Sequence, residues 1–330
     1  MKRFIWSALV LAVSTLVLSS CATDVTPSAV SALPPVTHPA DNPGTPAKIA
    51  LGKQLFVDTR LSGSGKMACQ SCHYRHLGWT DATPLSKRDD GVVNARHTPG
   101  LYNVGFQSLW YWDGRAATLE GQILAAWRGQ TGADPAKVAA VLNAVPGYRS
   151  QFQAVFGSDA TAQNIPQALA AYLRTKNSDN AAWDRYERGD KKAVSADAIE
   201  GQALFAGKGR CTFCHTPPLY GNSTFFNIGL EHGKTKPDIG RFNVSKVDSD
   251  MSAFKTPSLR SVELSGPYFH DGSVATLKES VRYMASGGKA DPNKSPLLVP
   301  TGLTEAEIDK VVAFLNSLTS SESWEPPKLP

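Results

Sequence analysis

The chain has 330 residues, 42% of them hydrophobic and 19% charged, and this length allows about two domains of roughly 150 residues. Its seven Trp, thirteen Phe and nine Tyr exclude intrinsic disorder, and the only apolar run near membrane length is N-terminal, which excludes a multi-span transporter. The formal net charge of +5 is not gathered into a block, so it argues against nucleic-acid binding.

The first twenty residues have the pattern of an export signal. Two basic residues precede the apolar run 4–18, which is short for the ~30 Å of hydrocarbon that a transmembrane anchor crosses. Small residues then lead to Cys21, so residues 1–20 resemble a bacterial lipoprotein signal peptide with Cys21 as the lipidated residue; an ordinary signal peptide is the alternative. We therefore expect a lipid-anchored protein on the periplasmic side of a Gram-negative bacterium, at the outer membrane. Residues 21–46 are Pro-rich, have no hydrophobic period and predict a tether.

The other four cysteines form two pairs, each followed by a histidine: Cys69-Gln-Ser-Cys72-His73 and Cys211-Thr-Phe-Cys214-His215. Disulfides or a redox dithiol are the simplest alternatives in an exported protein. However, Cys-x-x-Cys-His is the attachment sequence of c-type haem, whose vinyl groups bond the two thiols while the histidine becomes the proximal iron ligand. A shared zinc site is disfavoured because the pairs are far apart and each has its own histidine. The sequence therefore predicts two covalently bound haem c groups.

The sequence around each haem motif is repeated. A short apolar block precedes each motif (52–56 and 201–205), an Asp-Gly turn follows it (113–114 and 271–272), and a helical pattern closes each half (168–174 and 308–318). This order predicts a mainly α fold of two tandem cytochrome c-like helical domains, 47–190 and 191–330. Strands find little support, because the loops are rich in Gly, Pro, Asn and Lys rather than alternating.

The repeat separates the two haems. Met284 follows the second Asp-Gly turn at the spacing at which Ala126 follows the first. A thioether can be the sixth iron ligand and raises the potential, whereas an alanine cannot bind iron. The haem of His215 is therefore expected to be closed and to transfer electrons, and the haem of His73 to be open to a small ligand. A core-filling role for Met284 is the alternative.

Several blocks resemble the bacterial di-haem cytochrome c peroxidases and their relative MauG: 51–56, 112–116, 238–241, 254–260 and 266–272. The resemblance runs from about residue 51 to 318. It implies that the domain 47–190 holds the peroxidatic haem and 191–330 the electron-transfer haem. It also implies that Trp112 lies between the haems as an electron relay. Met284 falls where the peroxidases carry an axial Met and MauG-like enzymes a Tyr, and here the Tyr is the neighbouring Tyr283.

The chain also departs from this family. The histidine that caps the peroxidatic haem would fall near Asp89, and His76 and His97 are interpreted as structural. Of the distal Gln and Glu pair, Gln122 matches the Gln, while the Glu corresponds to Gln130 or to Glu120. The family's calcium site would use His97 and the carbonyl groups of Ser265 and Pro267, but calcium prefers oxygen ligands.

These features predict a peroxidase that catalyses H₂O₂ + 2 e⁻ + 2 H⁺ → 2 H₂O. The electrons would come from a small soluble donor, a cytochrome c or a cupredoxin. One alternative is a MauG-like oxidase that modifies Trp or Tyr side chains of a partner protein, and another is a di-haem electron carrier. A homodimer is left open. Because no capping histidine is found, the His73 haem is expected to be five-coordinate or water-bound and to need no reductive activation.

Overall fold

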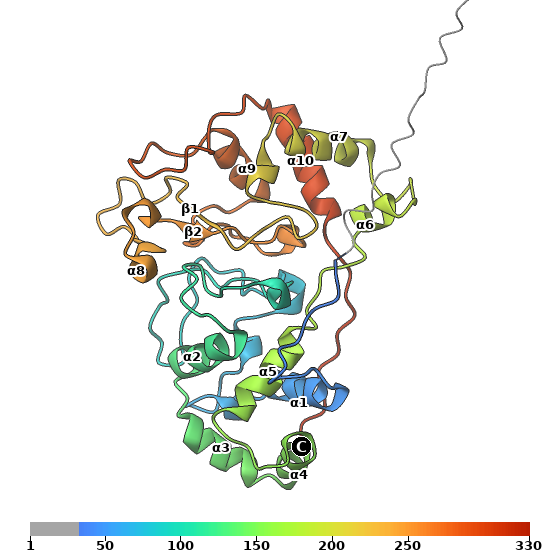
Figure 1. The fold of residues 1–330 in the computed structure, drawn as a ribbon, viewed down its shortest axis with the longest axis vertical. Helices are drawn as coiled ribbons and strands as arrows, with labels where there is room; N and C mark the ends of the chain where they lie inside the picture. Colours follow the sequence, from blue (N-terminus) through green and yellow to red (C-terminus); the bar gives the residue numbers. More distant parts are fainter. Residues whose placement is uncertain (1–32) are drawn as a thin grey trace, which may run out of the picture.

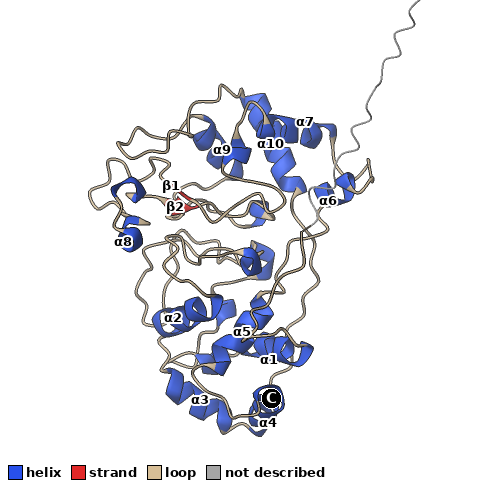
Figure 2. Ribbon diagram, viewed as in Figure 1, coloured by secondary structure: helices blue, strands red, loops and turns tan. Residues whose placement is uncertain are grey.

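A computed structural model describes residues 33–330. The predicted signal peptide, Cys21 and the first part of the predicted tether lie outside the described residues. The described chain forms two helical lobes, one above the other in Figure 1. Most of it is helix or long loop, as Figure 2 shows, so the predicted mainly α fold is confirmed. Within residues 33–330, no helix combines the length and hydropathy that crossing a bilayer requires.

The first lobe contains five α-helices, and a single 3₁₀ turn, Cys69–Ser71, carries its haem motif. Thr45 and Thr118 accept hydrogen bonds from the first-turn N–H groups of α1 and α2, which fixes where these helices begin. The sequence did not predict α3 and α4, although proline at the first helical position marks the start of both. The helices are α1 (Pro46–Val57), α2 (Leu119–Thr131), α3 (Pro135–Asn143), α4 (Pro146–Phe156) and α5 (Asn164–Leu173).

The second lobe repeats a helix, the haem motif, a threonine-capped helix and a closing helix, and it has no counterpart of α3 and α4. Its haem motif lies on the 3₁₀ turn Cys211–Phe213, and Thr276 caps α9 as Thr118 caps α2. One short antiparallel pair, β1 (Phe225–Phe226) with β2 (Phe254–Lys255), is the only sheet in the described residues. The helices are α6 (Ala182–Glu187), α7 (Ala196–Ala206), α8 (Phe242–Ser245), α9 (Leu277–Ala285) and α10 (Glu305–Ser317).

Each lobe is built on one close helix crossing. In the first lobe α1 crosses α5, and a Cβ atom on Gly52 would lie 2.0 Å from the Ala168 carbonyl oxygen. In the second lobe α7 crosses α10, and a Cβ on Gly201 would lie 1.9 Å from the Lys310 carbonyl oxygen. Both distances are far below van der Waals contact, so the two glycines allow the two backbones to touch. This crossing explains why the sequence repeats glycine at the same place before each haem motif.

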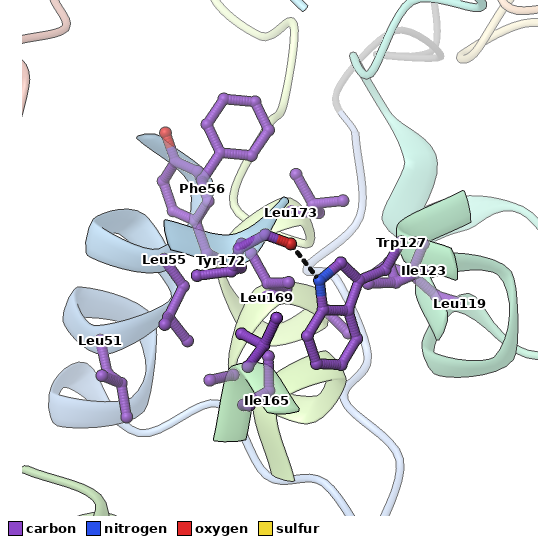
Figure 3. Close-up of a cluster of buried hydrophobic side chains, with 14 of the residues drawn as sticks. Leu51, Leu55, Phe56, Leu119, Ile123, Trp127, Ile165, Leu169, Tyr172 and Leu173 are labelled. Atoms are coloured by element: carbon purple, nitrogen blue, oxygen red, sulfur yellow. Dashed lines mark hydrogen bonds between the residues drawn. The ribbon is translucent and has the colours of Figure 1, made fainter. Parts of the chain in front are cut away.

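The apolar core of each lobe surrounds this crossing. In the first lobe it joins α1, α2 and α5, and Figure 3 shows the side chains converging between these helices. Trp127 is buried there, and its indole N–H donates a 2.6 Å hydrogen bond to the Leu61 carbonyl. The second lobe has a smaller core around Phe205, Tyr220 and Phe314. In the first lobe, this core therefore holds α2 against α1 and α5, next to the haem motif.

Both ends of the described chain pack on the first lobe. Asn42, in the predicted tether, is buried and donates hydrogen bonds to the Glu120 carboxylate (2.7 Å) and the Gln167 carbonyl (2.9 Å). The C-terminal segment, residues 319–330, leaves α10 and runs down the side of the molecule to α4 (Figure 1). Trp324 on this segment donates a 2.8 Å hydrogen bond from its indole N–H to the Tyr172 hydroxyl. A segment that follows the second haem motif in sequence therefore completes the first lobe.

A network of ions and backbone hydrogen bonds joins the lobes. Arg96 of the first lobe binds Asp113 of its own lobe (2.8 Å) and Asp238 of the second (2.6 Å). The Lys255 N–H donates to the Trp112 carbonyl at 2.8 Å. These contacts fix the first Asp-Gly turn against the second lobe.

Candidate haem sites

His73 is oriented by a backbone carbonyl. Its Nδ1 lies 2.7 Å from the Trp79 carbonyl oxygen, which can only accept, so Nδ1 carries the proton. The ring nitrogen that remains for a ligand bond is Nε2, and this arrangement is common for histidines that bind a metal. Burial lowers the pKa of His73, which favours the neutral ring that an iron ligand requires.

His215 repeats this arrangement in the second lobe. Its Nδ1 lies 2.9 Å from the Tyr220 carbonyl oxygen, and burial again lowers its pKa. Trp79 and Tyr220 both have positive φ angles, 62° and 51°, which turns each carbonyl toward the histidine. These two aromatic residues were not predicted from the sequence, where the available signal was their position six and five residues after the motif histidine.

The four motif thiols are free and partly exposed. Burial raises the pKa of Cys69 to about 12 and that of Cys72 to about 11, so a reactive redox dithiol, which needs a thiolate at neutral pH, is disfavoured. In each lobe the first cysteine begins a 3₁₀ turn, and the second cysteine and the histidine follow directly after that turn. This donor set fits a haem attached by two thioether bonds.

A large cavity of about 1100 Å³ opens beside the first motif. It exceeds the roughly 300–1,000 Å³ of ordinary small-molecule sites, and Cys69, Cys72 and His73 line it. Residues of the second lobe, including Asp238 and His270, also line it, so the cavity reaches the contact between the lobes. The first lobe therefore has room for a large planar group bonded to the motif.

Helix α2 forms one wall of this cavity, and the predicted distal residues Gln122 and Gln130 lie on that wall. Gln122, Ala126 and Gln130 line it, and their four-residue spacing places them along one face of the helix. Ala126 provides only a methyl group there. The face of α2 thus offers two amides on either side of a position that cannot bind iron.

Glu120, the alternative distal carboxylate, does not line the cavity. Its two oxygen atoms accept hydrogen bonds from Arg174 at 2.6 and 3.1 Å, and Asn42 adds a third. Burial alone would raise the pKa of Glu120, but the hydrogen bonds from Arg174 and Asn42 outweigh it and lower the pKa. Glu120 therefore remains ionised in a contact between α2, α5 and the predicted tether.

Asp89, near the place of a capping histidine, is also directed elsewhere. Its carboxylate accepts hydrogen bonds from the Ser64 backbone N–H (2.9 Å) and hydroxyl (2.5 Å). His76, the nearest histidine in sequence to the motif, is exposed, and its ring lies 5.9 Å from that of Tyr74. Neither residue lines the cavity.

Helix α9 is the counterpart of α2 in the second lobe. Met284 occupies the place of Ala126 and is half-buried. The hydroxyl of its neighbour Tyr283 donates a 2.9 Å hydrogen bond to the Ile228 carbonyl, and its ring packs on Phe269. The Tyr283 side chain is therefore bound to other protein groups. Met284, not Tyr283, is the residue equivalent to the cavity-lining Ala126.

Trp112 lies where the lobes meet. Its indole N–H donates a 2.9 Å hydrogen bond to the His97 carbonyl, and its ring is 6.5 Å from that of His270 in the second lobe. The Nε2 of His270 is 2.8 Å from the Glu231 carboxylate, and its ring stacks on Phe254. The Asp-Gly turns thus bring aromatic rings of both lobes together beside the cavity.

The residues of the calcium hypothesis are also at this contact. His97 is buried, its Nδ1 lies 2.8 Å from the Thr83 carbonyl, and its Nε2 has no hydrogen-bond partner in the described part of the chain. Ser265 and Pro267 line the cavity with it. The set offers one ring nitrogen and two carbonyl oxygens.

Two lobes that each carry a Cys-x-x-Cys-His turn under a helical frame define a di-haem c-type cytochrome, and the comparisons with known proteins identify its family. Residues 46–192 match the family described as di-haem cytochrome c peroxidase, and residues 198–319 match the cytochrome c family. The cytochrome-c peroxidase IdrP1 of Denitromonas iodatirespirans is 38% identical over 99% of this chain and 96% of its own. The methylamine utilization protein MauG of Methylorubrum extorquens is 40% identical over 86% of this chain and 81% of its own.

This chain therefore belongs to the di-haem cytochrome c peroxidase and MauG family, as its motifs predicted, and the family implies two haem c groups. A solved structure described as a MauG-like protein associated with microbial copper homeostasis has a TM-score of 0.82 and 31% identity, covering 87% of this chain and 93% of its own. The di-haem peroxidase BthA of Burkholderia thailandensis, at 20% identity and a TM-score of 0.73 over 88% and 90% of the two chains, shares the fold. The predicted class of two tandem cytochrome c-type domains is confirmed.

Proposed function

We propose that this protein reduces hydrogen peroxide to water at the first lobe and receives the electrons through the second. The observation that carries the proposal is the difference between two equivalent helices: Ala126 of α2 lines the cavity, and Met284 occupies the equivalent position of α9. An open first site can bind peroxide, and a closed His/Met site suits electron transfer. When bound, the haem groups supply the iron chemistry that cleaves the O–O bond.

The residues of the chain would orient and supply this chemistry. His73 and His215 would hold the two irons, with their ring orientations set by the carbonyls of Trp79 and Tyr220. Gln122 and Gln130 would hold peroxide and a water molecule by their amides, and the water would carry the proton from the inner to the outer oxygen. Trp112 would pass electrons between the lobes. Glu120 is left out of this set because Arg174 holds its carboxylate.

Steady-state consumption of peroxide tests this function. With a reduced small cytochrome c as donor, the haem-loaded chain should oxidise two donors for each peroxide. His73→Ala should abolish this reaction, while His76→Ala, which alters an exposed histidine of the same segment, should retain it. Equal activity of the two variants would contradict the assignment of the first site.

We further propose that the first site is open in the oxidised protein. The support is that the carboxylate of Asp89 is bound to Ser64 and that Ala126 offers no ligand. Electron paramagnetic resonance should then give one high-spin and one low-spin signal, with immediate reaction toward peroxide. Two low-spin signals, and activity only after one-electron reduction, would contradict an open site.

The location and further ligands are part of the same proposal. Export to the periplasm agrees with haem c attachment, and Cys21 would carry the lipid that anchors the chain to the outer membrane. Mass spectrometry of the mature N-terminus tests this anchor. Calcium is the least supported ligand, because His97 offers nitrogen where a hard cation prefers oxygen. The rates at which the same haem-loaded chain oxidises a reduced cupredoxin and a reduced cytochrome c, with peroxide present, distinguish the two donors.

A MauG-like activity on a partner protein is the second candidate. It is favoured by the cavity face of α2, which carries two amides and no carboxylate. In that case peroxide would be consumed slowly with a soluble donor and rapidly with a partner that gains oxygen or a cross-link. Donor oxidation at two electrons for each peroxide favours the peroxidase.

A further inference from the structure

Two tryptophans flank the first haem site, and their surroundings differ. Trp112 faces the second lobe, and its indole N–H donates to the His97 carbonyl. Trp79 lies beside His73 and is fully buried in an aromatic cluster, and no carboxylate or backbone carbonyl in the described part of the chain accepts a hydrogen bond from its indole N–H. Both residues adjoin the His73 site, since the Trp79 carbonyl accepts the His73 hydrogen bond and Trp112 lines the same cavity as His73.

A buried ammonium group covers Trp79. The Nζ of Lys176 lies 4.7 Å from the centroid of the Trp79 ring and 4.5 Å from that of Tyr172. Its side chain is 4% exposed, and its ion-pair partner, at 2.9 Å, is Glu322 of the C-terminal segment. Within residues 33–330, no lysine or arginine is found over the Trp112 ring.

This ammonium opposes the loss of an electron from Trp79. A neutral indole attracts a cation above its ring, but an oxidised indole is itself a cation and is repelled by it. The repulsion is strong here because the site is buried. The oxidised indole could also be relieved by releasing its N–H proton, but no carboxylate or backbone carbonyl among residues 33–330 accepts a hydrogen bond from that N–H.

A route to the surface begins at Trp79. Its ring is 5.9 Å from that of Trp324, edge to face, and Trp324 is hydrogen-bonded to Tyr172 and partly exposed. Electrons drawn along this route would come from the protein itself. Each indole hydroxylated in this way would convert one C–H group and one H₂O₂ into C–OH and H₂O, with two electrons passing from the indole to the peroxide.

We propose that Lys176, held by Glu322 of the C-terminal segment, keeps Trp79 reduced, so that electrons reach the first site through Trp112 and not from the aromatic cluster. This inference rests on the proposed function, because peroxide is the oxidant. The second lobe has a similar arrangement. The guanidinium of Arg260 lies 5.8 Å from the ring of Tyr220, the counterpart of Trp79, and is paired with Asp184 at 2.9 Å.

The test compares Lys176→Met, which removes the charge, with Lys176→Arg, which keeps it. The full haem-loaded chains are treated with peroxide without a donor, and peptide mass spectrometry measures the oxygen gained at Trp79, Trp324 and Trp112. We expect oxygen at Trp79 or Trp324 to rise about ten-fold or more in Lys176→Met and to stay at the wild-type level in Lys176→Arg. Equal oxidation of the two variants overturns the inference.

A second variant separates this role from a structural one. Lys176→Met leaves Glu322 unpaired, so Lys176→Met with Glu322→Gln removes both charges and is used if the single variant loads haem poorly. It should show the same rise in oxidised Trp79 or Trp324, and unchanged oxidation there overturns the inference. If the wild-type chain does not consume peroxide, the proposed function fails; normal consumption with unoxidised Trp79 in the variants contradicts only the role of Lys176.

Discussion

The first lobe places Ala126 on the cavity face of α2, and the second lobe places Met284 at the same position of α9. Around these positions the lobes are built alike: a glycine at the helix crossing, a histidine bonded to the carbonyl of an aromatic residue, and a threonine cap on the distal helix. The difference teaches that one frame can carry two different distal residues, because the frame fixes the histidine side of each site and leaves the opposite side to a single position of the helix.

The largest expected effect comes from making the lobes alike. Ala126→Met places a thioether on the cavity face of α2, where it can bind the sixth position of the iron. We expect the rate of peroxide consumption to fall by roughly two orders of magnitude or more, because peroxide needs that position. The high-spin resonance signal should disappear at the same time. Ala126→Leu fills similar space without a ligand and should keep the high-spin signal.

The amides of α2 are the next comparison, since the second lobe has Ser280 at the position of Gln122. Gln122→Leu should lower the rate of peroxide cleavage by about 10²-fold, at the lower end of what proton-transfer groups contribute. Stopped-flow mixing with peroxide measures this rate. Glu120→Gln is the matched control on the same helix: it should weaken the contact with Arg174 while leaving peroxide cleavage nearly unchanged. A larger loss in Glu120→Gln than in Gln122→Leu would reverse these assignments.

The converse variant removes the thioether of Met284 and so makes the second lobe resemble the first. Met284→Ala should abolish the thioether-to-iron charge-transfer absorption and lower the potential of the His215 haem, within the roughly 0.8 V range that axial ligands set. Spectroelectrochemical titration measures both. An unchanged spectrum would contradict ligation by Met284, and Tyr283→Phe, which removes the hydroxyl bonded to Ile228, serves as the control.

The smallest expected effect concerns Glu231, which binds His270 and the Asp238 N–H, two residues of the second lobe that contact the first. Burial alone would raise the pKa of Glu231, but hydrogen bonds from His270, Lys234 and the Asp238 N–H outweigh it and hold the pKa below its ordinary value of 4.5. The stabilisation is therefore present above about pH 4.5 and is lost as the pH falls through the lowered pKa.

Glu231→Gln should lower the free energy of unfolding by about 1.5–3 kcal/mol near neutral pH. It should also flatten the acid side of the stability curve, which chemical unfolding at several pH values measures. Lys208→Gln, in an exposed pair with Glu307, should change stability by less than about 1 kcal/mol. A similar loss in both variants would show that burial of Glu231 contributes nothing.

Much of this architecture could be predicted from the sequence, because covalent attachment of haem requires a motif with fixed spacing. The repeat predicted α1, α7 and the distal helices, and the resemblance to the family implied that Trp112 lies between the haems. Helices α3 and α4 were missed because they have no counterpart in the second half. Proline at the first position of both helices and the Asp134 cap of α3 are local signals that do not depend on the repeat.

The distal side of the first site was harder to predict, for a physical reason. Glu120 and Gln122 are two positions apart, so they point to different faces of α2, and spacing alone could not say which face meets the cavity. The packing of α2 against α5 decides it, through the long-range pair of Glu120 with Arg174. Lys176 and Glu322 are far apart in sequence and belong to no motif, so their contact could not be predicted.

The path of the C-terminal segment has a consequence for the order in which the molecule is made. Trp324 and Glu322 follow both haem motifs in the sequence and are synthesised after them, yet they complete the shell around Trp79 in the first lobe. A nascent chain that has already exposed its first haem motif cannot close that shell until the second lobe has been synthesised. The first lobe begins earlier than the second and is finished later, so a shortened chain that ends after residue 190 would carry the peroxide site without its outer wall.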